Sequence, residues 1–170
     1  MKTKKLTLCG LLTALAVVLS LAERLFPLDA VVPVPGVKLG LANVVTLFAL
    51  TRVSARDALA VVVCRVAITS LLMGSVTAFL FSLLGGLFSL TVMWALLRAE
   101  GRFCSLLGVS VAGAAAHNIG QVAAAVIWMQ TGAVIAYLPL LLVMSVPLGL
   151  VTGLTCSIVL SHMKKINFNV

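Results

Sequence analysis

Long apolar runs, separated by short polar or proline-containing connections, make up almost all of the sequence. Six of these runs are candidate membrane helices, judged against the roughly 20 residues that a helix needs to cross a bilayer; they cover 6–26, 39–52, 57–73, 75–97, 104–129 and 133–161. The second and third runs are short for a full crossing, so we expect them beside thinned or protein-lined regions. Pro139 and Pro147 should kink the last run, which is the longest.

The connection after the first run reads PLDAVVPVPGVKLG (27–40), and its three prolines and two glycines exclude a regular helix. Irregular backbone at membrane depth is tolerated only where protein buries it or where it lines a cavity. One interpretation is therefore a lid folded over the outer face of the bundle. A proline-stiffened surface loop fits equally well. Glu23, Arg24, Asp29 and Lys38 belong to this outer rim.

Composition places the chain among membrane proteins. Of the 170 residues, 62% are hydrophobic and only 9% are charged, and the mean hydropathy is +1.26. A soluble domain needs far more polar surface than this. We therefore expect a single all-α domain over residues 1–170, a polytopic membrane bundle of about six helices that is solvated by the lipid bilayer.

The distribution of basic residues predicts the orientation. The net charge is +8, but the basic residues sit in short clusters between apolar runs, which indicates membrane orientation rather than nucleic-acid binding. Nine of the twelve lie at alternate connections: Lys2, Lys4, Lys5, Arg52, Arg56, Arg98, Arg102, Lys164 and Lys165. This pattern puts both termini in the cytoplasm.

The first run has a second interpretation. The lysines at 2–5, a short apolar run and the residues SLA (20–22) are also typical of a secretory signal with a cleavage site. However, Gly10 and Ala14 are four residues apart, with Thr13 beside them, and this small-xxx-small pattern lets helices approach closely. The pattern favours a helix that stays in the protein and contacts a partner helix.

Arg65 is a charged residue inside a predicted membrane helix. It stands nine residues after Arg56, which places it about 13 Å from the cytoplasmic edge. An arginine without a partner at that depth costs at least about 2.5–3.5 kcal/mol, so its side chain should face the bundle interior, as should Thr69 one turn later. Arg65 is then either a ligand-binding residue or a packing staple satisfied by backbone carbonyls or by Asn118.

The stretch SVAGAAAHNIGQ (110–121) places three strong hydrogen-bonding side chains in one apolar helix. His117 and Gln121 are four residues apart and Asn118 and Gln121 are three apart, so each pair lies on a common face. The resulting patch lies at the depth of Arg65. It is either a binding site or a set of interhelical hydrogen bonds that hold the bundle together.

The charge balance near this depth favours an anionic or polar ligand. The candidate cations are Arg24, Lys38, Arg65 and His117. Asn43 can reach the same region, and Glu23 near the edge is the one acid beside them.

Catalytic motifs are missing: there is no aspartate-rich diphosphate motif, no glycine-rich ATP loop and no nucleophile elbow. Four cysteines (Cys9, Cys64, Cys104 and Cys156) lack metal-ligand spacing and are expected to be small buried hydrophobes. We predict no cofactor, no metal and no enzymatic activity of the chain alone.

Three segments together resemble a known family. PGVKLGLANVVTLFAL (35–50), RVAITSLLMGS (65–75) and SVAGAAAHNIGQ (110–121) resemble the bacterial Gx transporter family, also labelled heptaprenyl diphosphate synthase component I, in order and spacing through nearly the whole chain. That family is more distantly similar to the S components of energy-coupling factor transporters. Those are six-helix proteins of the bacterial cytoplasmic membrane that capture a vitamin-like molecule near the outer face.

The resemblance carries specific expectations about residues. It implies that the polar positions of the matching strings bind substrate, namely Lys38, Asn43, Arg65, His117, Asn118 and Gln121. It also implies that Gly10 and Ala14 contact a transmembrane coupling subunit of an ATPase-driven transporter.

Three functions remain open on the sequence. The leading hypothesis is a small-molecule binding and transport subunit energised by a partner ATPase, because the chain has no ATP-binding motif of its own. The alternative is a membrane accessory component of polyprenyl diphosphate or isoprenoid quinone synthesis. A structural subunit of a membrane redox complex is the third.

Overall fold

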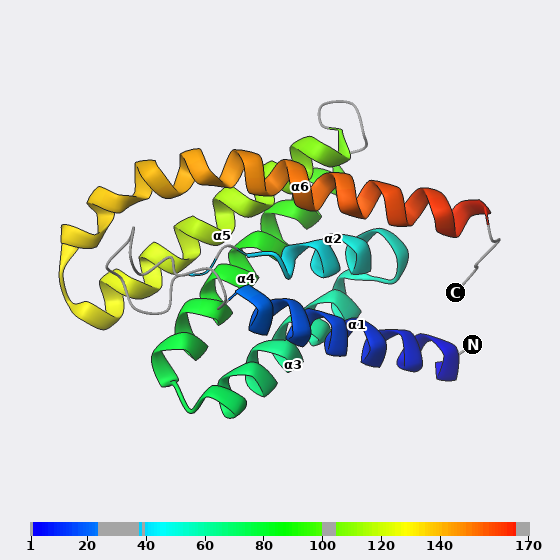
Figure 1. Ribbon diagram of the computed structural model, residues 1–170, viewed down its shortest axis with the longest axis horizontal. Helices are drawn as coiled ribbons and strands as arrows, with labels where there is room; N and C mark the ends of the chain where they lie inside the picture. The colour runs from blue at the N-terminus through cyan, green and yellow to red at the C-terminus, as the bar shows by residue number, and fades with distance from the viewer. Residues whose placement is uncertain (1, 24–37, 39, 100–104, 166–170) are drawn as a thin grey trace.

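The structure, a computed structural model, describes residues 2–23, 38, 40–99 and 105–165. These residues form helices and short turns without a strand, so the all-helical class is confirmed (Figure 1). The elements are α1 (Lys2–Ala22), α2 (Asn43–Arg52), α3 (Ala55–Met73), α4 (Val76–Arg98), α5 (Leu106–Met129), the 3₁₀ helix η3 (Gly132–Tyr137) and α6 (Leu138–Lys165).

Local sequence signals set several helix boundaries. The hydroxyl oxygens of Ser54, Ser75 and Ser105 accept backbone N–H bonds at the starts of α3, α4 and α5, as N-cap serines do. Gly74 ends α3 and Gln130 ends α5 in the left-handed conformation, with φ of 61° and 52°. Left-handed residues of this kind commonly terminate helices.

Four segments are long and apolar enough to cross a membrane: Thr3–Ala22, Val76–Arg98, Leu106–Met129 and Gly132–Lys164. The prediction of six candidate spans is therefore supported for four of them. The ten-residue α2 is only about 15 Å long, half of a crossing. Helix α3 approaches the required length but carries Arg56, Asp57 and Arg65 among its 19 residues.

The short helix α2 lies at the centre of the bundle. It contacts every one of the other five α-helices, and most of its side chains are buried. A half-length helix is tolerable at membrane depth only when protein surrounds it, because its end groups need partners that lipid cannot supply. Of the two surroundings expected for the second run, thinned or protein-lined, the structure supports the protein-lined one.

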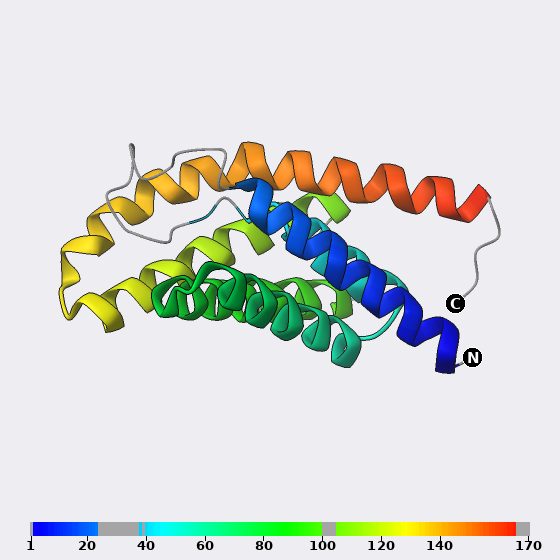
Figure 2. The same cartoon turned by 60° about the horizontal axis from the view of Figure 1, so that its bottom comes forward.

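The remaining helices surround α2. Helix α4 packs along α5, α5 along α6, and α1 along α3. Figure 2 shows α6 on one side of the bundle and the α3–α4 pair on the opposite side. The start of α1 and the end of α6 lie at the same end of the bundle, which we call the terminal end (Figure 1).

The two prolines of α6 have different effects. Pro139 lies in the first turn, where no backbone N–H partner is needed, so the expected kink at this position is wrong. Pro147 lies inside the helix, which continues through it to Lys165.

The surface of the described bundle is rich in large apolar side chains, while many polar side chains are buried. Leu71, Val143 and Ile158 are among the most exposed. The cysteine prediction is partly wrong: Cys156 is fully buried, but Cys9 is half-buried and Cys64 is exposed on the apolar surface. Cys104 lies outside the described residues.

Close contact between α4 and α5 depends on Gly120. A Cβ at this position would lie 2.7 Å from the carbonyl oxygen of Leu84 and 2.9 Å from Cα of Gly85, and these backbone atoms cannot move aside cheaply. Gly120→Ala should therefore destabilise the fold by about 1–3 kcal/mol. Gly10→Ala is the control, because its Cβ would meet nothing within 4 Å and should be neutral or stabilising by about 0.5–1 kcal/mol.

Unfolding of both variants in one detergent, followed by circular dichroism, measures the difference. The close approach of α4 and α5 is refuted if Gly120→Ala is as stable as Gly10→Ala.

Candidate functional site

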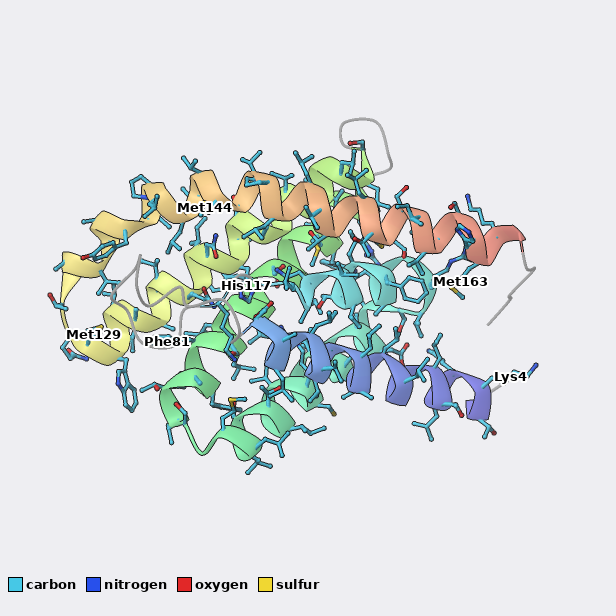
Figure 3. The ribbon with its side chains drawn as sticks, in the orientation of Figure 1. Lys4, Phe81, His117, Met129, Met144 and Met163 are labelled. Atoms are coloured by element: carbon cyan, nitrogen blue, oxygen red, sulfur yellow. The ribbon has the colours of Figure 1, made fainter. Side chains whose placement is uncertain are left out.

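Polar side chains from five helices and one connection gather in the middle of the bundle. His117 lies there, far from both Lys4 at the terminal end and Met129 at the opposite end (Figure 3). The members that are at least nine-tenths buried are Ser20, Glu23, Asn43, Arg65, His117 and Gln121, and the equally buried Ser82 and Ser89 lie one turn before and after the α4 glycines that contact them. We call these residues, together with Lys38, the central polar cluster.

Arg65 is only 4% exposed and has few partners. Its Nη1 donates to the hydroxyl of Ser20 on α1, 2.9 Å away. Its Nε and Nη2 make no hydrogen bond among the described residues. Thr69, expected on the same face, donates to the backbone carbonyl of Arg65 at 2.6 Å rather than contacting the guanidinium. One edge of the guanidinium therefore has no partner within the described ranges.

Glu23 follows the end of α1 and belongs to the buried cluster instead of the outer rim predicted for it. Its carboxylate is 4% exposed and accepts the backbone N–H of Ala42, at 3.4 Å, where α2 begins. A carboxylate is favourable at a helix N-terminus because the helix dipole is positive there. Glu23 also lies close enough to Arg65 and Lys38 for their charges to interact.

His117 and Gln121 meet on one face of α5, as their spacing predicts. The Gln121 amide satisfies all its neighbours in one orientation: its oxygen accepts from His117 Nε2 at 3.2 Å and from the Lys38 N–H at 3.0 Å, and its nitrogen donates to the Lys38 carbonyl at 3.2 Å. The backbone of Lys38 is thus fixed on α5. The other ring nitrogen of His117, Nδ1, lies against the backbone of Gly85 on α4 and makes no well-formed hydrogen bond among the described residues.

Asn43 is the first residue of α2 and is 3% exposed, yet neither atom of its amide group has a hydrogen-bond partner among the described residues. It faces Gly40, where a Cβ would lie 2.9 Å from Asn43 Nδ2 and 3.1 Å from His117 Cδ2. Gly40 has a φ of 81°, a left-handed conformation that favours glycine. The glycine therefore allows Asn43 and His117 to lie close together.

Two glycines of α4 form another wall of the cluster. A Cβ at Gly85 would lie 2.9 Å from His117 Cε1, and a Cβ at Gly86 would lie 3.3 Å from Arg65 Nη2. The adjacent glycines therefore let the histidine of α5 and the arginine of α3 both pack against α4. The positive charge of Arg65 acts on His117 as well, which places the two side chains in one electrostatic environment.

Asn118 points elsewhere. Its Nδ2 donates to the carbonyl oxygen of Leu141 on α6, at 2.7 Å, so it joins α5 to α6 and does not satisfy Arg65. Of the six residues predicted to bind substrate, the structure brings Asn43, Arg65, His117 and Gln121 into the cluster by their side chains. Lys38 joins through its backbone and its charge.

Sequence reasoning missed three members of the cluster, Ser20, Ser82 and Ser89, and placed a fourth, Glu23, near the edge. Ser20 and Glu23 are three residues apart and so share a helical face, a spacing that could have revealed them. On α4, residues 82, 85, 86 and 89 are all serine or glycine at helical spacing, which marks one small, buried face. The predicted lid over 27–40 lies outside the described residues, apart from Lys38 and Gly40.

The cluster combines buried donors and acceptors that lack partners in the part of the chain that the structure describes. They include two guanidinium nitrogens, both atoms of the Asn43 amide and one imidazole nitrogen. Buried polar atoms without partners each cost free energy, so their accumulation at one place is unfavourable unless something else satisfies them. Among the described residues no three His, Cys, Asp or Glu side chains are placed to hold a metal ion.

Comparison with known proteins identifies the family. The family model of heptaprenyl diphosphate synthase component I matches residues 12–159, most of the chain and five of its six α-helices in full or nearly so. Searches of curated proteins and of solved structures give no match. The match covers every member of the central polar cluster. Because the family model matches most of the sequence, the chain belongs to the heptaprenyl diphosphate synthase component I family.

Proposed function

We propose that this chain is a non-catalytic membrane component that binds a small molecule with an anionic group, and that it serves a separate prenyl diphosphate synthase. The family description supports a role beside a synthase. The observation that carries the binding role is the buried Arg65, whose Nε and Nη2 form an edge without partners among the described residues. Such an edge matches the two oxygens of a phosphate or carboxylate.

The neighbours of Arg65 fit an anionic ligand with further polar groups. Ser20 holds Nη1 and so directs the remaining edge of the guanidinium. Asn43 offers both a donor and an acceptor at the beginning of α2. His117 Nδ1 offers an acceptor for a ligand hydroxyl, because Nε2 of the same ring donates to Gln121. The beginning of α2 adds a partial positive charge, as in membrane transporters whose broken helices point at anionic substrates, and the Glu23 carboxylate already accepts one of the N–H groups there.

A second candidate is the transport subunit suggested by the resemblance to S components. The observation that favours it is on α1, where Gly10 and Ala14 are both exposed and a Cβ at Gly10 would meet nothing within 4 Å. This face is therefore open to a partner helix from another subunit.

Arg65 variants test the binding role with farnesyl diphosphate as the probe and farnesol as the uncharged comparison. Arg65→Lys should weaken farnesyl diphosphate binding by about 10-fold or more, because a point charge replaces a planar fork. Arg65→Leu should abolish it. Calorimetric titration in detergent measures the affinity, and thermal unfolding without ligand measures stability.

Arg98→Lys is the matched control, since Arg98 is exposed and stacks over Trp94 at 4.8 Å, away from the cluster. It should bind the probe as the unaltered chain does. The proposal fails if Arg65→Lys binds normally and Arg65→Leu unfolds without ligand, because Arg65 would then be a packing staple.

The partner distinguishes the two candidate functions. Tagged protein purified from mild detergent should retain a soluble prenyl diphosphate synthase, identified by mass spectrometry, and should raise its chain-elongation activity on vesicles. Recovery of an ATPase module instead would contradict the synthase role and favour transport. In that case Gly10→Leu with Ala14→Leu should release the module without lowering the melting temperature, because the face they occupy is open.

We also propose that the terminal end of the bundle faces the cytoplasm, as the basic residues predict. In a background without native cysteines, Ala30→Cys should react with a membrane-impermeant maleimide added outside intact cells, and Glu100→Cys should react only after lysis. The opposite labelling pattern would invert the topology.

A further inference from the structure

A cavity with basic residues in its wall lies at the terminal end, away from the central polar cluster. It has a volume of about 460 Å³. Helix α2 contributes Thr51 and Arg52, α5 contributes its first residue, and α6 contributes the remaining wall; the lining residues are Thr51, Arg52, Leu106, Ser157, Leu160, Ser161 and Lys164. None of them belongs to the central polar cluster, so this cavity is a separate feature of the fold.

The lining is basic and carries no acidic side chain. The only ion pair within 4.0 Å that the described residues form joins Lys5 to Asp57 at 2.6 Å, and neither of these lines the cavity. The charges of Arg52 and Lys164 are therefore not neutralised by any carboxylate in the part of the chain that the structure describes. Two cations beside one cavity attract an anion, and they do so most strongly near the low-dielectric membrane.

Arg52 is held in position at the cavity wall. Its Nη2 donates to the backbone carbonyl of Leu160, at 3.4 Å, which fixes the end of α2 against α6 and leaves other guanidinium N–H groups available. The hydroxyls of Thr51 and Ser161 donate to carbonyls within their own helices, at 2.9 and 2.7 Å. Ser157 makes no hydrogen bond through its side chain among the described residues, so its hydroxyl can donate into the cavity.

Apolar side chains accompany the charged groups of the cavity and are exposed beside it on α6. Leu106 and Leu160 supply apolar walls beside the charged groups. On α6, Leu154 lies about one turn before Ser157, and Ile158 lies about one turn before Ser161. These two apolar side chains are 51% and 57% exposed. A molecule with an anionic head and a hydrocarbon tail can thus place its head between Arg52 and Lys164 and its tail along the outer face of α6.

We propose that this cavity binds the phosphate or diphosphate group of an amphiphilic molecule at the membrane surface. Arginine and lysine are the usual ligands of phosphoryl groups, through a planar fork and a point charge respectively. The inference rests on the cavity and its charges and does not depend on the function proposed for the central polar cluster. In the topology proposed above, the head of the bound lipid is at the cytoplasmic surface.

The test uses the full chain in detergent micelles, with dioleoyl phosphatidic acid as the phosphoryl lipid and dioleoyl phosphatidylcholine as the comparison. Native mass spectrometry counts bound lipids, and a titration at low salt gives the affinity. Phosphatidic acid should bind more tightly than phosphatidylcholine. Arg52→Gln and Lys164→Gln should each weaken its binding by about fivefold, the loss of one cation near a membrane surface.

The control is a double variant, Arg56→Gln with Arg98→Gln, which removes two exposed basic residues from the same end of the bundle outside the cavity. Its affinity for phosphatidic acid should stay within about twofold of that of the unaltered chain, a smaller change than the loss of one cation at the cavity causes. Equal losses in the control and in the cavity variants would overturn the site, because the binding would then reflect net charge alone. Failure of phosphatidic acid to bind better than phosphatidylcholine would overturn it as well.

A stability measurement and a competition experiment complete the test. Because Arg52 links α2 to α6, Arg52→Gln can lower stability, whereas Lys164 is exposed and its removal should leave the melting temperature unchanged. A normal affinity in correctly folded Lys164→Gln contradicts the proposal. Inorganic diphosphate distinguishes the ligand's source: competition with phosphatidic acid assigns binding to the phosphoryl group itself, and no competition assigns it to the whole lipid held by head and tail.

Discussion

The structure depends on keeping one arginine solvated in the middle of an apolar bundle. Arg65 is almost completely buried, and removing a guanidinium from water costs several kcal/mol unless charged and polar groups replace the water. Ser20 supplies one hydrogen bond and Glu23 supplies a nearby negative charge. Packing near the arginine is arranged around this need, since Gly86 of α4 makes room for its guanidinium.

The half-length helix α2 connects this requirement to the rest of the fold. It begins in the middle of the bundle, where Glu23 accepts the N–H of Ala42, and it contacts all five other α-helices. A helix that began at the membrane surface would not bring Asn43 to this depth, and its N-terminus would not meet the buried Glu23 carboxylate. The half-length helix α2 thus holds the bundle together and also supplies Asn43 to the site.

Much of this arrangement could be predicted from sequence, because charge and periodicity report depth and face. Spacing placed Arg65 and His117 in mid-helix and paired His117 with Gln121. It could not distinguish α2 from a short span, because burial by neighbouring helices leaves no mark in a local apolar run. The neighbours of Arg65 and Asn118 were also out of reach, since the partners Ser20 and Leu141 are 45 and 23 residues away in the chain.

The central claim is that the edge of Arg65 formed by Nε and Nη2 receives a ligand oxygen. An experimental structure of the protein purified from its native membrane, at a resolution that separates side chains from bound molecules, tests this most directly. The account predicts density that belongs to neither protein nor lipid tail, within about 3 Å of both nitrogens, the usual length of a charge-assisted hydrogen bond. If the Glu23 carboxylate or backbone carbonyls accept the hydrogen bonds of both nitrogens, Arg65 is a structural residue and the central claim is contradicted.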